Sequence, residues 1–171
     1  LDWNVDVNLG STDIYVLFNT SSQEYAKLNA SGNLQLRTGA DMVPDIFGSV
    51  ISTDGKVYYE VPMVSDIEMS ISLAKLDWRG DPRNPFISFK GVETFRVTPN
   101  EMSPALDDKK NLVPVFVEAL VEEKPLKSIQ INFEISSANA AVQNMLAALP
   151  KETREAYAIN MLVFGRINSG T

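Results

Sequence analysis

Residues 67–78 read Ile-Glu-Met-Ser-Ile-Ser-Leu-Ala-Lys-Leu-Asp-Trp, and this stretch decides the fold class. Apolar and polar side chains alternate up to Leu73, which is typical of a β-strand with one buried face. The alternation resumes from Ala74 with its apolar phase moved by one residue. Because a β-bulge adds one residue to a strand, we predict a single long strand with a bulge near Leu73.

The same alternation recurs over most of the chain, interrupted by polar segments and by segments with Gly or Pro. Asp54-Gly55 favours a hairpin turn, and the two prolines within residues 80–85 favour a rigid corner. We expect further breaks at residues 10–13, 31–32, 91 and 122–125, and a surface loop at 99–111. The predicted strands are residues 3–9, 14–18, 25–30, 34–37, 46–50, 57–61, 67–78, 86–90, 92–98, 113–121 and 129–135.

The period changes towards the C-terminus, where two short helices are predicted. Ser136-Ser137 can cap a helix over residues 139–149, and Pro150 suits the first turn of a second helix that stops at Gly165. Two short helices cover only part of a long sheet, so we expect a mainly β fold with a curved antiparallel sheet and an apolar interior. We divide this single domain, a fragment of a longer chain, into a β-rich groove-forming region (1–136) and a helical end with its tail (137–171).

The composition excludes several kinds of chemistry. The chain has 171 residues, a formal net charge of -7, no Cys and no His. Thiolate chemistry and cysteine-ligated metals are therefore excluded, the commonest proton-transfer side chain is missing, and the acidic charge disfavours nucleic acid. We expect no catalytic residue, no metal and no cofactor.

Carboxylates are the remaining candidates for catalysis, and Asp77 and Asp81 flank the corner. Their alternative roles are to end a strand and to cap a turn, which we favour. Calcium at Asp54, Asp66, Asp77 or Asp81 would require a calcium-loop spacing that the sequence lacks.

Three motifs together resemble the C-terminal domain of TamB, an AsmA-like, bridge-type protein of diderm bacteria. They are Gly-Ser-Val-Ile-Ser-Thr-Asp-Gly-Lys-Val-Tyr-Tyr at 48–59, Gly-Asp-Pro-Arg-Asn-Pro at 80–85, and Glu-Ala-Tyr-Ala-Ile-Asn-Met-Leu-Val-Phe-Gly at 155–165. The last is similar to versions from Bacteroides-like bacteria. The resemblance covers residues 34–165, and the charged loop at 99–111 departs from it.

The resemblance implies a U-shaped, β-taco-like sheet in the periplasm, anchored to the inner membrane by an N-terminal helix outside this sequence and reaching the outer membrane. It also implies transport of phospholipid between the membranes and assembly of outer-membrane proteins beside TamA, a β-barrel partner. A filled sandwich core and a lipid groove both require alternating apolar and polar residues, so the sequence pattern does not distinguish between these two structures. A non-transporting assembly module that docks through a strand edge or a helix face, and an unrelated closed β-sandwich, are the alternatives.

Two sets of residues carry these functional predictions. Apolar side chains that would line a lipid groove are Val57, Val61, Ile67, Met69, Ile71, Leu73, Val115, Val117, Ile129, Ile131 and Phe133. Side chains on the helical end that would dock a partner, or instead plug the end of the sheet, are Met145, Leu149, Tyr157, Met161 and Phe164.

Overall fold

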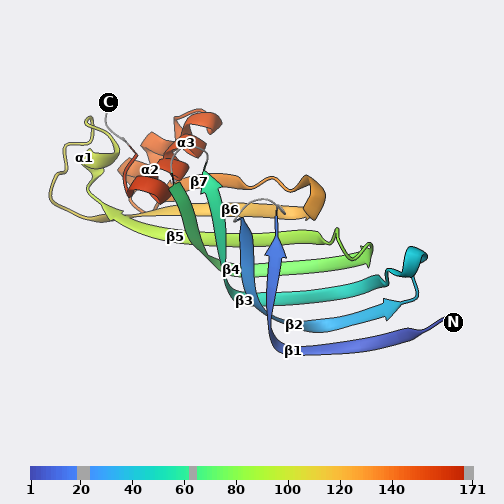
Figure 1. Cartoon of the computed structure of the whole chain (residues 1–171). Helices are drawn as coiled ribbons and strands as arrows, with labels where there is room; N and C mark the ends of the chain where they lie inside the picture. The colour runs from blue at the N-terminus through green and yellow to red at the C-terminus, as the bar shows by residue number, and fades with distance from the viewer. Residues whose placement is uncertain (19–23, 62–64, 168–171) are drawn as a thin grey trace. The chain divides into compact units, whose positions relative to one another are not determined.

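The computed structural model describes residues 1–18, 24–61 and 65–167, without the side chains of residues 61, 65 and 66. The described residues form one sheet in which strands that follow each other in sequence are neighbours (Figure 1). The prediction of a mainly β, antiparallel fold is confirmed. The strands are β1 (Asn4–Leu17), β2 (Tyr25–Arg37), β3 (Asp45–Val61), β4 (Ser65–Gly80), β5 (Phe86–Val97), β6 (Val113–Pro125) and β7 (Asn132–Ser137).

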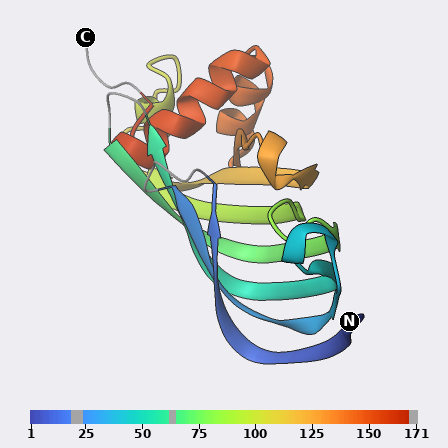
Figure 2. The ribbon, with the colours of Figure 1, turned by 45° about the vertical axis from the view of Figure 1, so that its right-hand side comes forward.

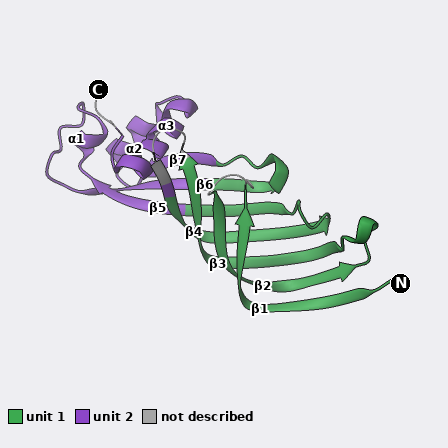
Figure 3. Ribbon diagram, viewed as in Figure 1, with its two compact units in different colours: residues 1–60, 68–91, 120–131 green, residues 61–67, 92–119, 132–171 purple. Residues whose placement is uncertain are grey.

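Helical segments are short. They are α1 (Pro99–Met102), α2 (Ala140–Ala147) and α3 (Lys151–Phe164), with 3-10 turns η1 (Ala40–Met42) and η2 (Leu126–Ser128). Contacts divide the chain into two compact units, coloured separately in Figure 3. Unit 1 comprises residues 1–60, 68–91 and 120–131, and unit 2 comprises residues 61–67, 92–119 and 132–171.

The strands of unit 1 are longer than predicted, because several expected turns lie inside strands. β1 runs through residues 10–13, β2 through 31–32, β3 through Asp54-Gly55, and β5 through Gly91. The predictions of turns or breaks at these places are therefore wrong. Gly55 has a different role: a Cβ there would lie 2.6 Å from the carbonyl oxygen of Lys27, so glycine permits the close approach of β2 and β3.

Bulges replace these turns. The register between β1 and β2 shifts between Leu9 and Thr12, and the pairing of β2 with β3 leaves Thr53 as an extra residue. A third shift leaves Ser72 as the extra residue of β4 against β5, which confirms the bulge predicted near Leu73. Bulges bend a strand, and β1 and β2 each turn through a corner part-way along (Figures 1 and 2).

Each bulge also exchanges the inward and outward faces of its strand. In β4, Ile71 is 4% exposed and Ala74 is 3% exposed, whereas Leu73 is 51% exposed. The prediction that Leu73 faces inward with Ile71 is therefore wrong, because the extra residue at Ser72 turns it to the solvent.

The corner at residues 80–85 holds the connection between β6 and β7 within unit 1. The Leu126 amide donates to the Pro85 carbonyl at 2.9 Å, and the Lys127 amide donates to Asn84 Oδ1 at 2.9 Å. Asp81 Oδ1 accepts from the Arg83 amide at 2.9 Å, so its predicted role as a turn cap is confirmed. The predicted turn at 122–125 is wrong: β6 continues to Pro125, and η2 reverses the chain instead.

In unit 2, α2 and α3 pack on β7. Val142, Leu146 and Met161 are fully buried at 0% exposure. Asn139, rather than the predicted Ser136-Ser137, caps α2, because its Oδ1 accepts from the Val142 amide at 3.1 Å. The predicted stop of the last helix at Gly165 is confirmed by a left-handed φ of 67°.

The segment 99–111, expected to be a surface loop, is partly ordered by α1. Thr98 and Glu101 form a reciprocal capping box at the start of this helix. Met102 is only 3% exposed, and α1 contacts α2. The segment thus contributes an apolar side chain to the core of unit 2.

Candidate functional site

The interior of unit 1 is tightly packed where its sheet folds back on itself. The second half of β1 and the first half of β2, which pair with each other, place apolar side chains against those of β4 and β5, and only about 10 Å³ of void remains between them. This void is no larger than the ~10–15 Å³ that a single water molecule needs. Phe18 is half-buried and Lys75 is exposed, but the other side chains around this void are only 2–7% exposed: Val16, Ala26, Leu28, Ile71, Ala74, Leu76, Ile87 and Phe89. This part of the structure therefore contains no open channel for an acyl chain.

The first half of β1, the second half of β2 and the first residues of β3 leave apolar side chains accessible. Directly paired residues share one face of a sheet, and two paired rows cross these three strands. Val5 is 48% exposed, and the other apolar members are half-buried. We call this surface the open apolar face; it comprises Val5, Val7, Leu34, Leu36 and Ile46.

The opposite face of the same strands has a different chemistry. Pairing places Asp6 opposite Gln35, and Asn8 opposite Asn33, on that side. These side chains help to line a hollow of about 600 Å³, together with Phe47. Polar side chains predominate on this side and aliphatic ones on the other, so this part of the sheet is amphipathic, although Val7 and Leu34 also border the hollow.

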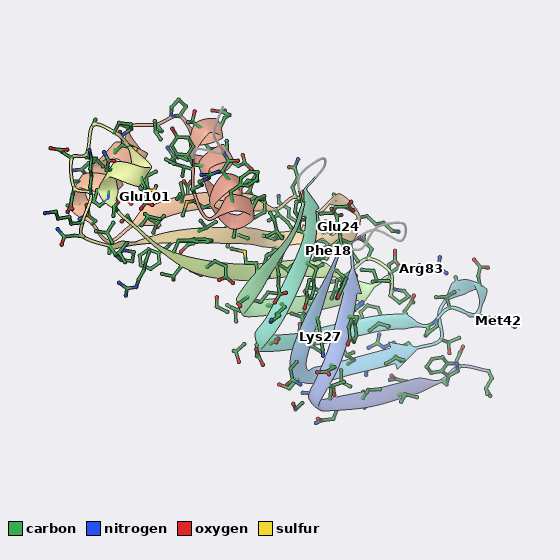
Figure 4. All side chains as sticks on the ribbon, turned by 60° about the vertical axis from the view of Figure 1, so that its left-hand side comes forward. Phe18, Glu24, Lys27, Met42, Arg83 and Glu101 are labelled. Carbon is green, nitrogen blue, oxygen red and sulfur yellow. The ribbon has the colours of Figure 1, made fainter. Side chains whose placement is uncertain are left out.

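A separate pocket of about 350 Å³ lies in unit 1 beside the β6–β7 connection; we call it the connection pocket. The Phe18 amide donates to the Glu24 carbonyl at 3.1 Å, and Figure 4 shows these two residues side by side. Phe18 also borders the packed interior. The connection pocket is lined by apolar Phe18, Tyr59, Leu126, Ile129 and Ile131 and by polar Glu24, Lys127 and Gln130.

The predicted groove-lining residues fall into different environments. Buried members in unit 1 are Val57 (3% exposed), Met69 (1%) and Ile71 (4%). Buried members in unit 2 are Ile67 (2%), Val115 (0%), Val117 (0%) and Phe133 (7%). Ile129 and Ile131 precede β7 rather than belonging to it, and they line the connection pocket. The side chain of Val61 lies outside those that the structure describes.

The predicted docking residues do not form one exposed face. Met161 is fully buried at 0% exposure, so the prediction that it faces a partner is wrong. Phe164 is 46% exposed, whereas Met145, Leu149 and Tyr157 are half-buried. The helices are fixed to β7 by an ion pair from Arg154 Nε to Glu134 Oε1 at 2.8 Å. Most of this set therefore packs within unit 2.

Asp77 and Asp81, the candidate catalytic carboxylates, are engaged in structural contacts. Asp77 accepts hydrogen bonds from the Ser49 hydroxyl at 2.8 Å and from Arg79 Nε at 2.9 Å. Burial raises the pKa of Asp77, but these hydrogen bonds outweigh it, so its pKa is lowered from the ordinary value. The hydrogen bond from the Arg83 amide, followed by that from Lys127, lowers the pKa of Asp81. Carboxylates held ionised in this way are poorly suited to act as general acids.

Arg79 completes this cluster. Its guanidinium also pairs with Glu123, and its Cζ lies 3.8 Å from the ring centroid of Phe86. Planar guanidinium groups favour such stacked, multiply hydrogen-bonded positions. The cluster therefore ties β4, β5 and β6 together beside the corner.

The fold and surfaces above agree with a match to a protein-family model, the TamB C-terminal domain, over residues 1–171. The chain belongs to this family. TamB membership indicates a periplasmic, membrane-associated protein with a role in outer-membrane assembly. Comparison with curated proteins and with solved structures gives no match. Among the residues that the structure describes, no helix has the length and apolar character needed to cross a bilayer.

Sequence reasoning missed the open apolar face of this TamB domain, and of the connection pocket it identified only Ile129 and Ile131. The members of the open apolar face lie in predicted strands. The predicted groove-lining residues, however, all lie in later strands, where the alternation of apolar and polar residues is stronger. The connection pocket joins residues about 100 positions apart, such as Phe18 and Ile129, and no local pattern brings them together. The aromatic Phe18 at the end of an apolar run was the only available signal.

Proposed function

We propose that this TamB domain has a non-enzymatic role and shields phospholipid acyl chains on the open apolar face during transport towards the outer membrane. The observation that carries the proposal is the pair of half-exposed aliphatic rows across β1, β2 and β3, represented by Val5 at 48% exposure. Transfer of a methylene group from water to an apolar surface contributes about 0.8 kcal/mol and needs no directional contact. Such a surface suits acyl chains of any headgroup class.

The packed interior gives the open apolar face its significance. Acyl chains can contact Val5 or Leu36 without displacing protein, whereas contact with Met69 or Ile71 requires the walls of unit 1 to separate. Lining of a lipid groove by the buried predicted set stays a prediction. We propose that lipid contact is concentrated on the accessible rows.

A second candidate function is docking of an outer-membrane β-barrel protein of the TamA type, through a strand edge. The strand order places β1 at one end of the sheet, and residues 4–9 and 12–17 of this strand pair with β2 on one side. Main-chain groups on an unpaired edge can add a strand from a partner. This role is compatible with a sealed interior.

Photo-crosslinking in cells that produce the intact protein separates the two candidates. A crosslinking residue is placed at Val5 or Leu36, on the open apolar face, with Asp6 and Gln35 on the opposite face as matched controls. Phospholipid adducts at the first pair and few at the second are expected. Adducts with protein alone at Val5 and Leu36 would contradict lipid shielding and favour strand-edge docking.

A further inference from the structure

The connection pocket is a second accessible site, with a mixed polar and apolar lining, that the open apolar face does not include. Its volume of about 350 Å³ falls within the range of roughly 300–1,000 Å³ that is typical of small-molecule sites. At the ~30 Å³ that a water-sized group occupies, it accommodates about twelve such groups. That space suits the polar end of a lipid together with the first part of one acyl chain.

Phe18 sets the inner limit of this pocket. Its side chain is half-buried and borders both the connection pocket and the packed interior, where only about 10 Å³ is free. An acyl chain in the connection pocket therefore has no open continuation past Phe18 into the packed interior. The pocket is a terminal site rather than a passage through unit 1.

The charges at the pocket indicate the kind of headgroup. Lys127 and Glu24 both line it, and Lys127 Nζ lies 3.2 Å from Asp81 Oδ2. The Lys127 side chain is 64% exposed, so its ammonium can share its hydrogen bonds with a second anion. One positive and two negative groups repel a purely anionic headgroup, but they complement a headgroup that carries both a phosphate and an ammonium group.

We propose that the connection pocket binds a zwitterionic phospholipid. The phosphate lies against Lys127, the headgroup ammonium lies towards Glu24, and the beginning of one acyl chain packs on Ile129 and Ile131. This inference rests on the proposed function, because it assumes that phospholipid reaches the domain. It adds a headgroup preference that the open apolar face alone does not provide.

The test uses photo-crosslinking at Ile129 and, separately, at Val5 in cells that produce the intact protein, with mass spectrometry of the adducts. Adducts at Ile129 are expected to be enriched in phosphatidylethanolamine over phosphatidylglycerol, relative to the adducts at Val5. Lys127→Gln is expected to lower the Ile129 adduct roughly two- to five-fold, the range for a solvent-exposed charge contact. Glu24→Gln is expected to shift the remaining adducts towards phosphatidylglycerol.

Two controls separate lipid contact from damage to the corner. Asp81→Asn removes the same ion pair as Lys127→Gln but keeps the ammonium, so it should not lower the adduct yield. Lys124→Gln, an exposed lysine of β6 that is not among the residues lining the pocket, should have no effect. An equal loss with Asp81→Asn, or equal headgroup ratios at Ile129 and Val5, would overturn the proposal.

The failure of this inference and of the proposed function give different results. Lipid adducts at Val5 with none at Ile129, or protein adducts alone at Ile129, refute the phospholipid site and leave lipid shielding intact. An absence of lipid adducts at both positions refutes lipid shielding as well.

Discussion

Leu76→Ala tests whether the interior of unit 1 is a packed core rather than an open channel for an acyl chain. Leu76 is 2% exposed and borders a void of only about 10 Å³. At ~24 cal/mol per Å³, this existing void costs about 0.2 kcal/mol, so the site starts close to full packing density. Removing three carbons forfeits roughly 2.4 kcal/mol of transfer free energy, and the new cavity adds to it. We expect a loss of about 3 kcal/mol in the free energy of unfolding.

Leu73→Ala is a matched control, because it makes the same chemical change three residues earlier in β4, at a side chain that is 51% exposed. Its expected cost is below about 1 kcal/mol. Urea unfolding followed by circular dichroism measures the free energy of unfolding of both variants. In thermal unfolding, the midpoint temperature should fall by roughly 6–12 °C for Leu76→Ala. Equal losses for the two variants, or a loss under about 1 kcal/mol for Leu76→Ala, would refute both the packed interior and the bulge at Ser72.

Three further predictions follow from local geometry. Gly48→Ala should destabilise the protein by about 1–3 kcal/mol, because φ is +115° and a Cβ would lie 2.3 Å from the Asn33 carbonyl oxygen. The control Gly10→Ala should be tolerated, because a Cβ there would have nothing within 4 Å. Equal urea midpoints for the two variants would contradict this prediction. Asn139→Ala should cost about 1 kcal/mol through loss of the α2 cap, whereas Asn144→Ala on the exposed side should not, as thermal unfolding of the pair will show. The pKa of Asp81 is lowered by the Arg83 amide and by Lys127, so its contribution to stability is present above the unfolded pKa of ~3.9 and is lost as the pH falls through the lower folded pKa. The stability difference between the native chain and Asp81→Asn should therefore shrink below about pH 4, and a difference that is independent of pH would count against this assignment.

Much of the sheet could be predicted from alternation alone, and the errors share one cause. In β4 the apolar phase shift at Leu73 and Ala74 indicated a bulge, which the structure confirms. The same kind of shift occurs in β1, but it falls on Gly10-Ser11-Thr12-Asp13, whose residue types also favour turns. These residue types predict a turn, but β1 pairs with β2 on both sides of them, so they form a bulge within one strand.

The connection pocket shows what local patterns cannot supply. Ile129 and Ile131 alternate with polar residues and were predicted to lie in a strand, yet η2 and the corner at 80–85 hold this segment outside β7. Hydrogen bonds from Leu126 and Lys127 to Pro85 and Asn84 determine its path. These contacts join residues about 40 positions apart, so periodicity within either segment carries no information about them.

The positions of the bulges determine which residues of each long strand point inward. Before Thr53, even-numbered residues of β3 such as Val50 point inward, and after it odd-numbered residues such as Val57 do so. Deleting the bulge residue Thr53 would leave this alternation continuous, whereas deleting a single residue after it, such as Gly55, would invert the rest of the strand and carry Lys56 into the apolar side. Single-residue insertions or deletions between a bulge and the end of its strand should be selected against much more strongly than changes of two residues, whatever the chemical nature of the residues added or removed.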